Sequence, residues 1–96
     1  IEIKTGIFRI YQESLTNVLK HAQASKVDAS LHLDNNIITL AISDNGIGFD
    51  EAEIEKKKTF GMLGIKERTS LLKGNCLFLG KPGLGTTVLV KIPISV

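Results

Sequence analysis

The chain has 96 residues, of which 43% are hydrophobic and 23% charged, and its formal net charge is +2. This length and composition are typical of a single soluble globular domain and argue against a disordered chain. The basic residues do not gather in one long run, so no nucleic-acid partner is expected, and no apolar stretch approaches the ~20 residues that a membrane span needs.

The single cysteine, Cys76, excludes an internal disulfide and a metal site built from cysteines. We interpret it as a small strand residue in a protein of a reducing compartment. The chain begins at Ile1 and not at a methionine. We therefore interpret residues 1–96 as one domain of a longer protein whose sensory or membrane parts lie elsewhere.

The first predicted element is a helix from about Phe8 to Ala22, with Thr5 as its capping residue. Apolar residues recur there at spacings of three and four, which is the pattern of one buried helix face. The predicted buried stripe consists of Phe8, Tyr11, Leu15, Val18, Leu19 and Ala22.

Two strands are predicted next, because apolar and polar residues alternate over residues 27–33 and again over residues 38–42. The Asp-Asn-Asn sequence at residues 34–36 predicts a tight turn, so the two strands form a hairpin. Residues 50–59 are charged and have little apolar periodicity, which predicts a mobile loop with at most one helical turn.

A second helix is predicted from Leu63 to Lys73, ended by Gly74 and Asn75 in a left-handed conformation. A short strand over residues 77–79, a turn at residues 81–83 and a last strand over residues 86–94 follow. This order of elements predicts a two-layer α/β (α+β) sandwich. Its sheet is mixed and largely antiparallel, with the helices packed on one face.

Four polar residues of the first helix share one arc, which we predict to lie roughly opposite the apolar stripe. They are Glu13, Asn17, Lys20 and His21. Asparagine is a poor helix former, but its amide oxygen suits Mg²⁺, a hard cation that prefers oxygen ligands. The alternative interpretation is an ordinary solvated helix face.

The second polar group follows the strand of residues 38–42. By the alternation of that strand, Asp44 points to the core side at the strand end, where a carboxylate needs a partner. An adenine amino group is one possible donor, and Gly46 and Gly48 would allow the backbone to approach a base closely. An ordinary Asp-Asn-Gly turn is the alternative.

Two further segments carry candidate binding residues. Gly61 and Gly64 stand at the start of the second helix, where backbone N–H groups and the helix dipole favour a phosphate, although a flexible helix start explains them equally well. Thr86 opens the last strand and is predicted to point to the same face of that strand as its apolar residues. It could therefore converge with Asp44 on one ligand, or simply bond to the backbone.

These four segments, in this order, resemble the nucleotide-binding boxes of histidine kinase ATPase domains, a GHKL-type branch of the superfamily that includes gyrase, heat-shock chaperone and mismatch-repair ATPases. The first segment looks like the N box, in the form found in nitrate-sensor and lipid-fluidity-sensor kinases. The others look like the first glycine box, the second glycine box and the closing Gly-Thr box. The matching stretches are YQESLTNVLKHA (residues 11–22), DNGIGF (44–49), FGMLGIKER (60–68) and GTT (85–87).

The resemblance implies a role for each candidate residue. Asn17 would provide the side-chain oxygen for Mg²⁺, Asp44 would accept a hydrogen bond from the adenine amino group, and Thr86 would assist Asp44. Glu13 would act as general base or position the attacking group. The remaining residues would approach the phosphates or shape the pocket and its lid: Lys20, His21, Gly46, Gly48, Gly61 and Gly64.

The function implied is that of a protein-histidine kinase domain that binds Mg-ATP and donates the γ-phosphate to a histidine in two-component signalling. The acceptor would lie on a dimerisation and phosphotransfer domain of the same protein, because His21 lies inside the N box and His32 in mid-strand. The chain alone would therefore not phosphorylate itself. Its parent would be a homodimer that phosphorylates a response regulator, with this domain in the cytoplasm and the sensor anchored in a membrane.

Two other functions fit the same sequence. An anti-sigma-type serine kinase shares the fold and would phosphorylate a serine on a partner protein. A nucleotide-binding docking module would bind without transferring phosphate.

Overall fold

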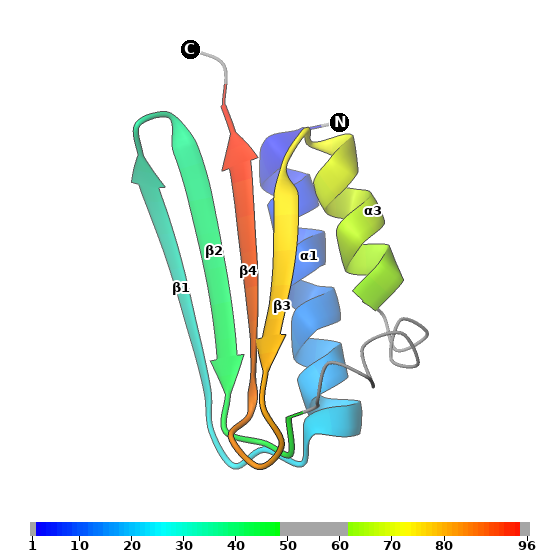
Figure 1. The fold of residues 1–96 in the computed structure, drawn as a ribbon. Helices are drawn as coiled ribbons and strands as arrows, with labels where there is room; N and C mark the ends of the chain where they lie inside the picture. The colour runs from blue at the N-terminus through cyan, green and yellow to red at the C-terminus, as the bar shows by residue number, and fades with distance from the viewer. Residues whose placement is uncertain (1, 49–61, 95–96) are drawn as a thin grey trace.

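The computed structural model of the chain describes residues 2–48 and 62–94, without the side chains of residues 21 and 22. Two helices lie side by side over one face of a four-stranded sheet, which makes two layers (Figure 1). The elements in chain order are α1 (Ile3–Asn17), η1 (Val18–Ala22), β1 (Val27–Asp34), β2 (Ile37–Asp44), α3 (Leu63–Leu71), β3 (Asn75–Gly80) and β4 (Thr86–Pro93).

The strand order in the sheet is β1-β2-β4-β3, and every pairing among the described strands is antiparallel. The predicted two-layer sandwich is confirmed. The predicted hairpin is also present, with Asn35 and Asn36 both at positive φ, 51° and 61°. Two consecutive left-handed residues match the twist of the flanking strands, and asparagine adopts this conformation more readily than most residues.

The core lies between the sheet and the helices. Alternate residues of β2 and β4 point toward the helices and are buried, as their apolar alternation predicts. Burial of each large aliphatic side chain contributes about 1.5–3 kcal/mol to folding. The buried cluster consists of Ile10, Leu40, Ile42, Ile65, Leu72, Val88, Val90 and Ile92.

The buried face of α1 agrees only in part with the predicted stripe, of which Tyr11 packs against the core. Phe8 is 57% exposed and Leu19 is 86% exposed, whereas the buried residues of the helix are Gly6, Ile10 and Ser14. A side chain at Gly6 would come within 2.6 Å of Leu72, so this helix needs small residues where it meets its neighbours. Apolar spacing does mark part of this face, because Ile3, Ile7 and Ile10 recur at intervals of four and three, whereas Gly6 and Ser14 carry no hydrophobic signal.

The helix also begins earlier than predicted. It begins at Ile3, so Thr5 lies inside the first turn and is not the cap. The capping position belongs to Glu2, whose carboxylate accepts a 3.4 Å hydrogen bond from the Thr5 hydroxyl. The predicted end at Ala22 is confirmed, but the last five residues are π-helical.

The second helix ends close to its predicted boundary, with a different residue in the left-handed conformation. Lys73 has φ +61°, and Gly74 does not have positive φ. Gly74 instead serves close packing, because a side chain there would overlap the carbonyl oxygen of Lys91. The prediction of a left-handed Gly74 or Asn75 was therefore wrong in detail.

Cys76 is a half-buried strand residue, as interpreted from the sequence. Burial raises the pKa of its thiol to about 11, although the nearby Lys66 charge lowers it somewhat. The thiol is therefore protonated at neutral pH and is a poor nucleophile. The predicted loop at residues 50–59 lies outside the described residues. Within the described ranges, no helix has the length and apolar character that crossing a bilayer requires.

Candidate functional site

Two polar residues at strand ends lie directly opposite each other. Asp44 is the last residue of β2 and Thr86 the first of β4, and the antiparallel register pairs the two. Asp44 lies two positions after buried Ile42, and Thr86 lies two positions before buried Val88. Since residues two positions apart in a strand point to the same face, both side chains point to the helix side of the sheet. Directly opposed side chains have Cβ atoms about 4.5–5.5 Å apart, so these two side chains are adjacent.

The Asp44 carboxylate is oriented by its own loop. Its Oδ1 accepts a 2.8 Å hydrogen bond from the Gly46 N–H, two residues further along the chain. No other described residue donates a hydrogen bond to the second oxygen, Oδ2. Among the described residues, the carboxylate is thus held through one of its two oxygens.

The loop after β2 crosses the turn between β3 and β4 at very short range. Gly48 and Gly85 both have positive φ, +65° and +85°. A Cβ atom on Gly48 would overlap the carbonyl oxygen of Lys81, and one on Gly85 would overlap that of Asp44. Gly85 directly precedes Thr86 in the chain. The close approach of Gly85 to the Asp44 backbone therefore also fixes the position of Thr86 relative to Asp44.

Asn45 holds a third segment against this loop, a role that the sequence analysis missed. Its Oδ1 accepts hydrogen bonds from the backbone N–H groups of Ser25 and Lys26, at 2.9 and 3.0 Å. Its Nδ2 donates to the Ser25 hydroxyl at 2.9 Å. The segment after η1 is thereby joined to the residue next to Asp44. Nothing in the local pattern of an Asp-Asn-Gly turn identifies that partner.

Glu13 and Asn17 do not face away from the core. Both are half-buried, and they follow buried Ile10 by three and seven positions, which places them beside Ile10 and Ser14 on one helix face. The prediction that they lie opposite the apolar stripe was wrong because the stripe itself was misplaced. A simple solvated face therefore does not describe these two residues.

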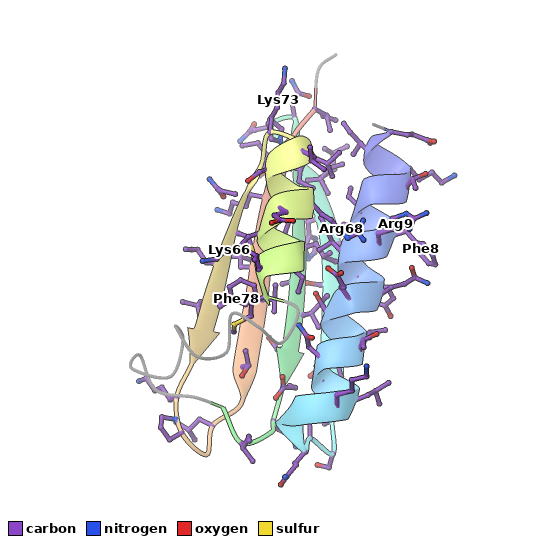
Figure 2. The ribbon with its side chains drawn as sticks, turned by 90° about the vertical axis from the view of Figure 1, so that its right-hand side faces the viewer. Phe8, Arg9, Lys66, Arg68, Lys73 and Phe78 are labelled. Atoms are coloured by element: carbon purple, nitrogen blue, oxygen red, sulfur yellow. The ribbon has the colours of Figure 1, made fainter. Side chains whose placement is uncertain are left out.

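Glu13 and Gly64 are brought together across the two helices. A Cβ atom on Gly64, in the first turn of α3, would lie 3.0 Å from each carboxylate oxygen of Glu13. The carboxylate also faces Arg68 of the same helix, with 3.5 Å between Glu13 Oε2 and Arg68 Nε. Figure 2 shows Arg68 in the space between α3 and α1.

Lys20 and His21 lie in η1, the π-helical continuation of α1. Single turns of π-helix are rare and occur often at functional sites. Lys20 is exposed, whereas the His21 side chain and the whole of Gly61 lie outside the described residues. In Figure 1, η1 lies at the same end of the domain as the last residues of β2 and the first residues of β4.

Among the predicted site residues, the structure thus brings Asp44 beside Thr86 and Glu13 beside Gly64. A separate groove of about 660 Å³ lies between α1 and the β1–β2 hairpin. It is lined mainly by apolar residues such as Ile7. That lining does not suit a phosphate chain, so we place the candidate site at the strand ends and not in the groove.

A family model described as "Histidine kinase-, DNA gyrase B-, and HSP90-like ATPase" matches residues 2–96. The chain belongs to this ATPase family. The resemblance inferred from the four boxes is confirmed, and ATP is the nucleotide that the family assignment gives to this domain.

Similar curated proteins are histidine kinases. The signal transduction histidine-protein kinase/phosphatase DegS of Bacillus subtilis is 40% identical over 96 residues, which cover 98% of this chain and 25% of DegS. The oxygen sensor histidine kinase NreB of Staphylococcus carnosus is 37% identical over 98% of this chain and 27% of its own length. The ATPase domain described here spans about a quarter of these relatives.

Solved structures of the same architecture include an ATP binding domain and a histidine kinase. The ATP binding domain of PrrB from Mycobacterium tuberculosis superimposes with a TM-score of 0.81 at 22% identity, over 96% of this chain and 69% of that one. The Acinetobacter baumannii histidine kinase AdeS gives 0.81 at 21% identity, over 96% and 47%. At these identities the likeness confirms the predicted fold.

The predicted class of function, an ATP-binding domain of the histidine kinase type, is confirmed by the family and its relatives. None of these comparisons favours a serine kinase or a docking module. The roles of the individual site residues stay predictions.

Proposed function

We propose that this domain binds Mg-ATP through the strand-end site and donates the γ-phosphate to a histidine on another domain of its parent kinase. The observation that carries the proposal is the pairing of Asp44 with Thr86. This pairing puts a carboxylate, held through one oxygen by the Gly46 N–H, beside the Thr86 hydroxyl. The pair lies at the end of the domain where η1 also lies.

The adenine end of the ligand would meet Oδ2 of Asp44, the oxygen that does not accept the Gly46 N–H. The exocyclic amino group of adenine donates hydrogen bonds, whereas guanine presents a carbonyl oxygen at the equivalent ring position. A carboxylate there attracts the first group and repels the second. Thr86 can donate to or accept from a ring nitrogen or a bridging water, so the pair favours ATP over GTP.

The phosphate end fits Asn17 and a magnesium ion. Among the described residues, no group of three or more His, Cys, Asp or Glu side chains is close enough to form a protein cage for a metal. Mg²⁺ does not need one, because it is commonly held by one or two protein oxygens together with substrate phosphates and water. The amide oxygen of Asn17 would be such a ligand. When bound, the ion would neutralise charge that develops on the phosphates.

The remaining candidates would act on the transferred phosphoryl group. Lys20 and His21 would approach the phosphate tail, and Gly61 and Gly64 would form the lid over it. Glu13 would position or deprotonate the attacking imidazole nitrogen of the acceptor histidine. Phosphoryl transfer depends mainly on such positioning and charge stabilisation, since the protein itself makes few covalent bonds in it.

The wider setting is also part of the proposal. Since the domain spans about a quarter of its relatives, the acceptor histidine would lie on a dimerisation and phosphotransfer domain elsewhere in a homodimeric parent. That parent would pass the phosphate to a response regulator. We place the domain in the cytoplasm, where ATP is available, and the parent in a membrane.

Calorimetric titration of the chain with a non-hydrolysable ATP analogue tests the proposal. We expect binding that Mg²⁺ strengthens, and a GTP analogue should bind much more weakly. Comparable affinity for both analogues would argue against adenine recognition by Asp44. No binding of either analogue to the folded chain would contradict a preformed nucleotide site.

Replacement of Asn17 by alanine should remove most of the effect of Mg²⁺ on ATP binding. Loss of one metal ligand should reduce the Mg²⁺-dependent gain in affinity by about tenfold, or about 1.4 kcal/mol. The measurement is the same titration with and without Mg²⁺. Gln12→Ala on the exposed face of the same helix is the matched control. An undiminished Mg²⁺ effect in Asn17→Ala would exclude Asn17 as the ligand.

A further inference from the structure

An ion pair joins the two helices at a residue that none of the proposed binding roles includes. Arg68 lies in the last turn of α3, and its Nε is 3.5 Å from Oε2 of Glu13 on α1. The Arg68 side chain extends from α3 toward α1 (Figure 2). Its partner is the residue that the proposed function places next to the reacting groups.

Two residues of α3, four positions apart, meet the Glu13 carboxylate. The first is Gly64, whose backbone leaves no room for a side chain without displacing the carboxylate by a few tenths of an ångström. The second is Arg68, which contributes its guanidinium. Oε2 is buried and accepts no hydrogen bond within the described part of the chain. Among the described residues, the cation that this oxygen meets in an ion pair is the Arg68 guanidinium.

We propose that Arg68 is a positioning residue for Glu13 in phosphoryl transfer. This inference rests on the proposed function. A carboxylate beside the triphosphate of ATP is repelled by it, and a carboxylate that turns away cannot align an attacking nucleophile. The positive charge of Arg68 holds Glu13 against the first turn of α3, close to the predicted lid glycine Gly64.

A purely structural role accounts poorly for this pair. The Arg68 and Glu13 side chains are 40% and 33% exposed. Ion pairs of this exposure contribute little to folding stability, because water screens the attraction and two long side chains lose rotamer freedom. An Arg68→Gln variant should therefore fold normally, which allows its kinetics to be measured.

The test is autophosphorylation by the intact parent kinase, with the maximal rate and the KM for ATP measured separately. Arg68→Gln should lower the maximal rate by about tenfold to a hundredfold, the usual cost of a misplaced catalytic group. Its KM should change by less than about threefold. Arg68→Lys should recover part of the rate because it restores the charge. Arg9→Gln, on the exposed face of α1, is the matched control and should leave the rate unchanged.

A double variant separates positioning from an independent effect. If Arg68 acts through Glu13, Glu13→Gln/Arg68→Gln should be no slower than Glu13→Gln alone. Multiplied losses, an unchanged rate in Arg68→Gln, or a rise in KM alone would each overturn the inference. A wild-type kinase that phosphorylates no histidine would instead overturn the proposed function, so the two failures are distinguishable.

Discussion

Asp44→Asn should lower the affinity of the domain for ATP by about a hundredfold. The change keeps the shape of the side chain, and the amide oxygen can still accept the hydrogen bond from Gly46. The amide nitrogen then faces the adenine amino group, so a donor meets a donor. Loss of a hydrogen bond to a charged group costs about 1.5–3 kcal/mol, which corresponds to roughly 10-fold to 150-fold in Kd.

Titration with ATP and GTP analogues measures this effect, and the preference for adenine should disappear with the affinity. Asp34→Asn is the matched control, because Asp34 also ends a strand but is exposed. It lies at the turn of the β1–β2 hairpin, far from Thr86 in the register. An Asp44→Asn variant that folds and keeps its full affinity for ATP would rule out Asp44 as the adenine contact.

Gly85→Ala should destabilise the domain by about 3 kcal/mol and disrupt the site together with the fold. The new methyl group would overlap the carbonyl oxygen of Asp44, and the backbone would also have to keep a φ of +85°. Overpacking typically costs about 1–3 kcal/mol of folding stability. A residue other than glycine in the left-handed conformation costs about 1–2 kcal/mol more. For a domain of this size the melting temperature should fall by roughly 15 °C.

Gly83→Ala separates the two causes. Gly83 also has positive φ, +78°, but a Cβ atom there would meet nothing within 4 Å. It should therefore cost only the backbone term, about 1 kcal/mol. Denaturant unfolding of both variants gives the comparison. Equal losses of unfolding free energy would show that the close crossing beside Asp44 does not contribute, and the account of Gly85 would have to be abandoned.

Much of the fold could be predicted from local patterns. The alternation of apolar residues in β2 and β4 reports which side chains point inward, because successive side chains of a strand point to opposite faces. The two asparagines between β1 and β2 have the conformational freedom that a two-residue turn requires. These features depend on neighbours in the sequence, and the structure confirms them.

The buried face of α1 was predicted only in part. Its fully buried residues are a glycine, an isoleucine and a serine, and Ile3, Ile7 and Tyr11 pack partly buried beside them. The predicted stripe began at Phe8 and so contained Tyr11 but also Phe8 and Leu19, which are exposed. The side on which Glu13 and Asn17 lie followed from that choice, so both were assigned to the wrong side of the helix.

The sequence by itself determined the class of fold, the order of the four boxes and the family, because each depends on spacing along the chain. Only the tertiary structure decided which of these residues meet. The pairing of Asp44 with Thr86 depends on sheet register, the bonds of Asn45 on a loop some twenty positions earlier, and the contact of Glu13 with Arg68 on how two helices pack. Such contacts arise between distant segments, and no local periodicity encodes them.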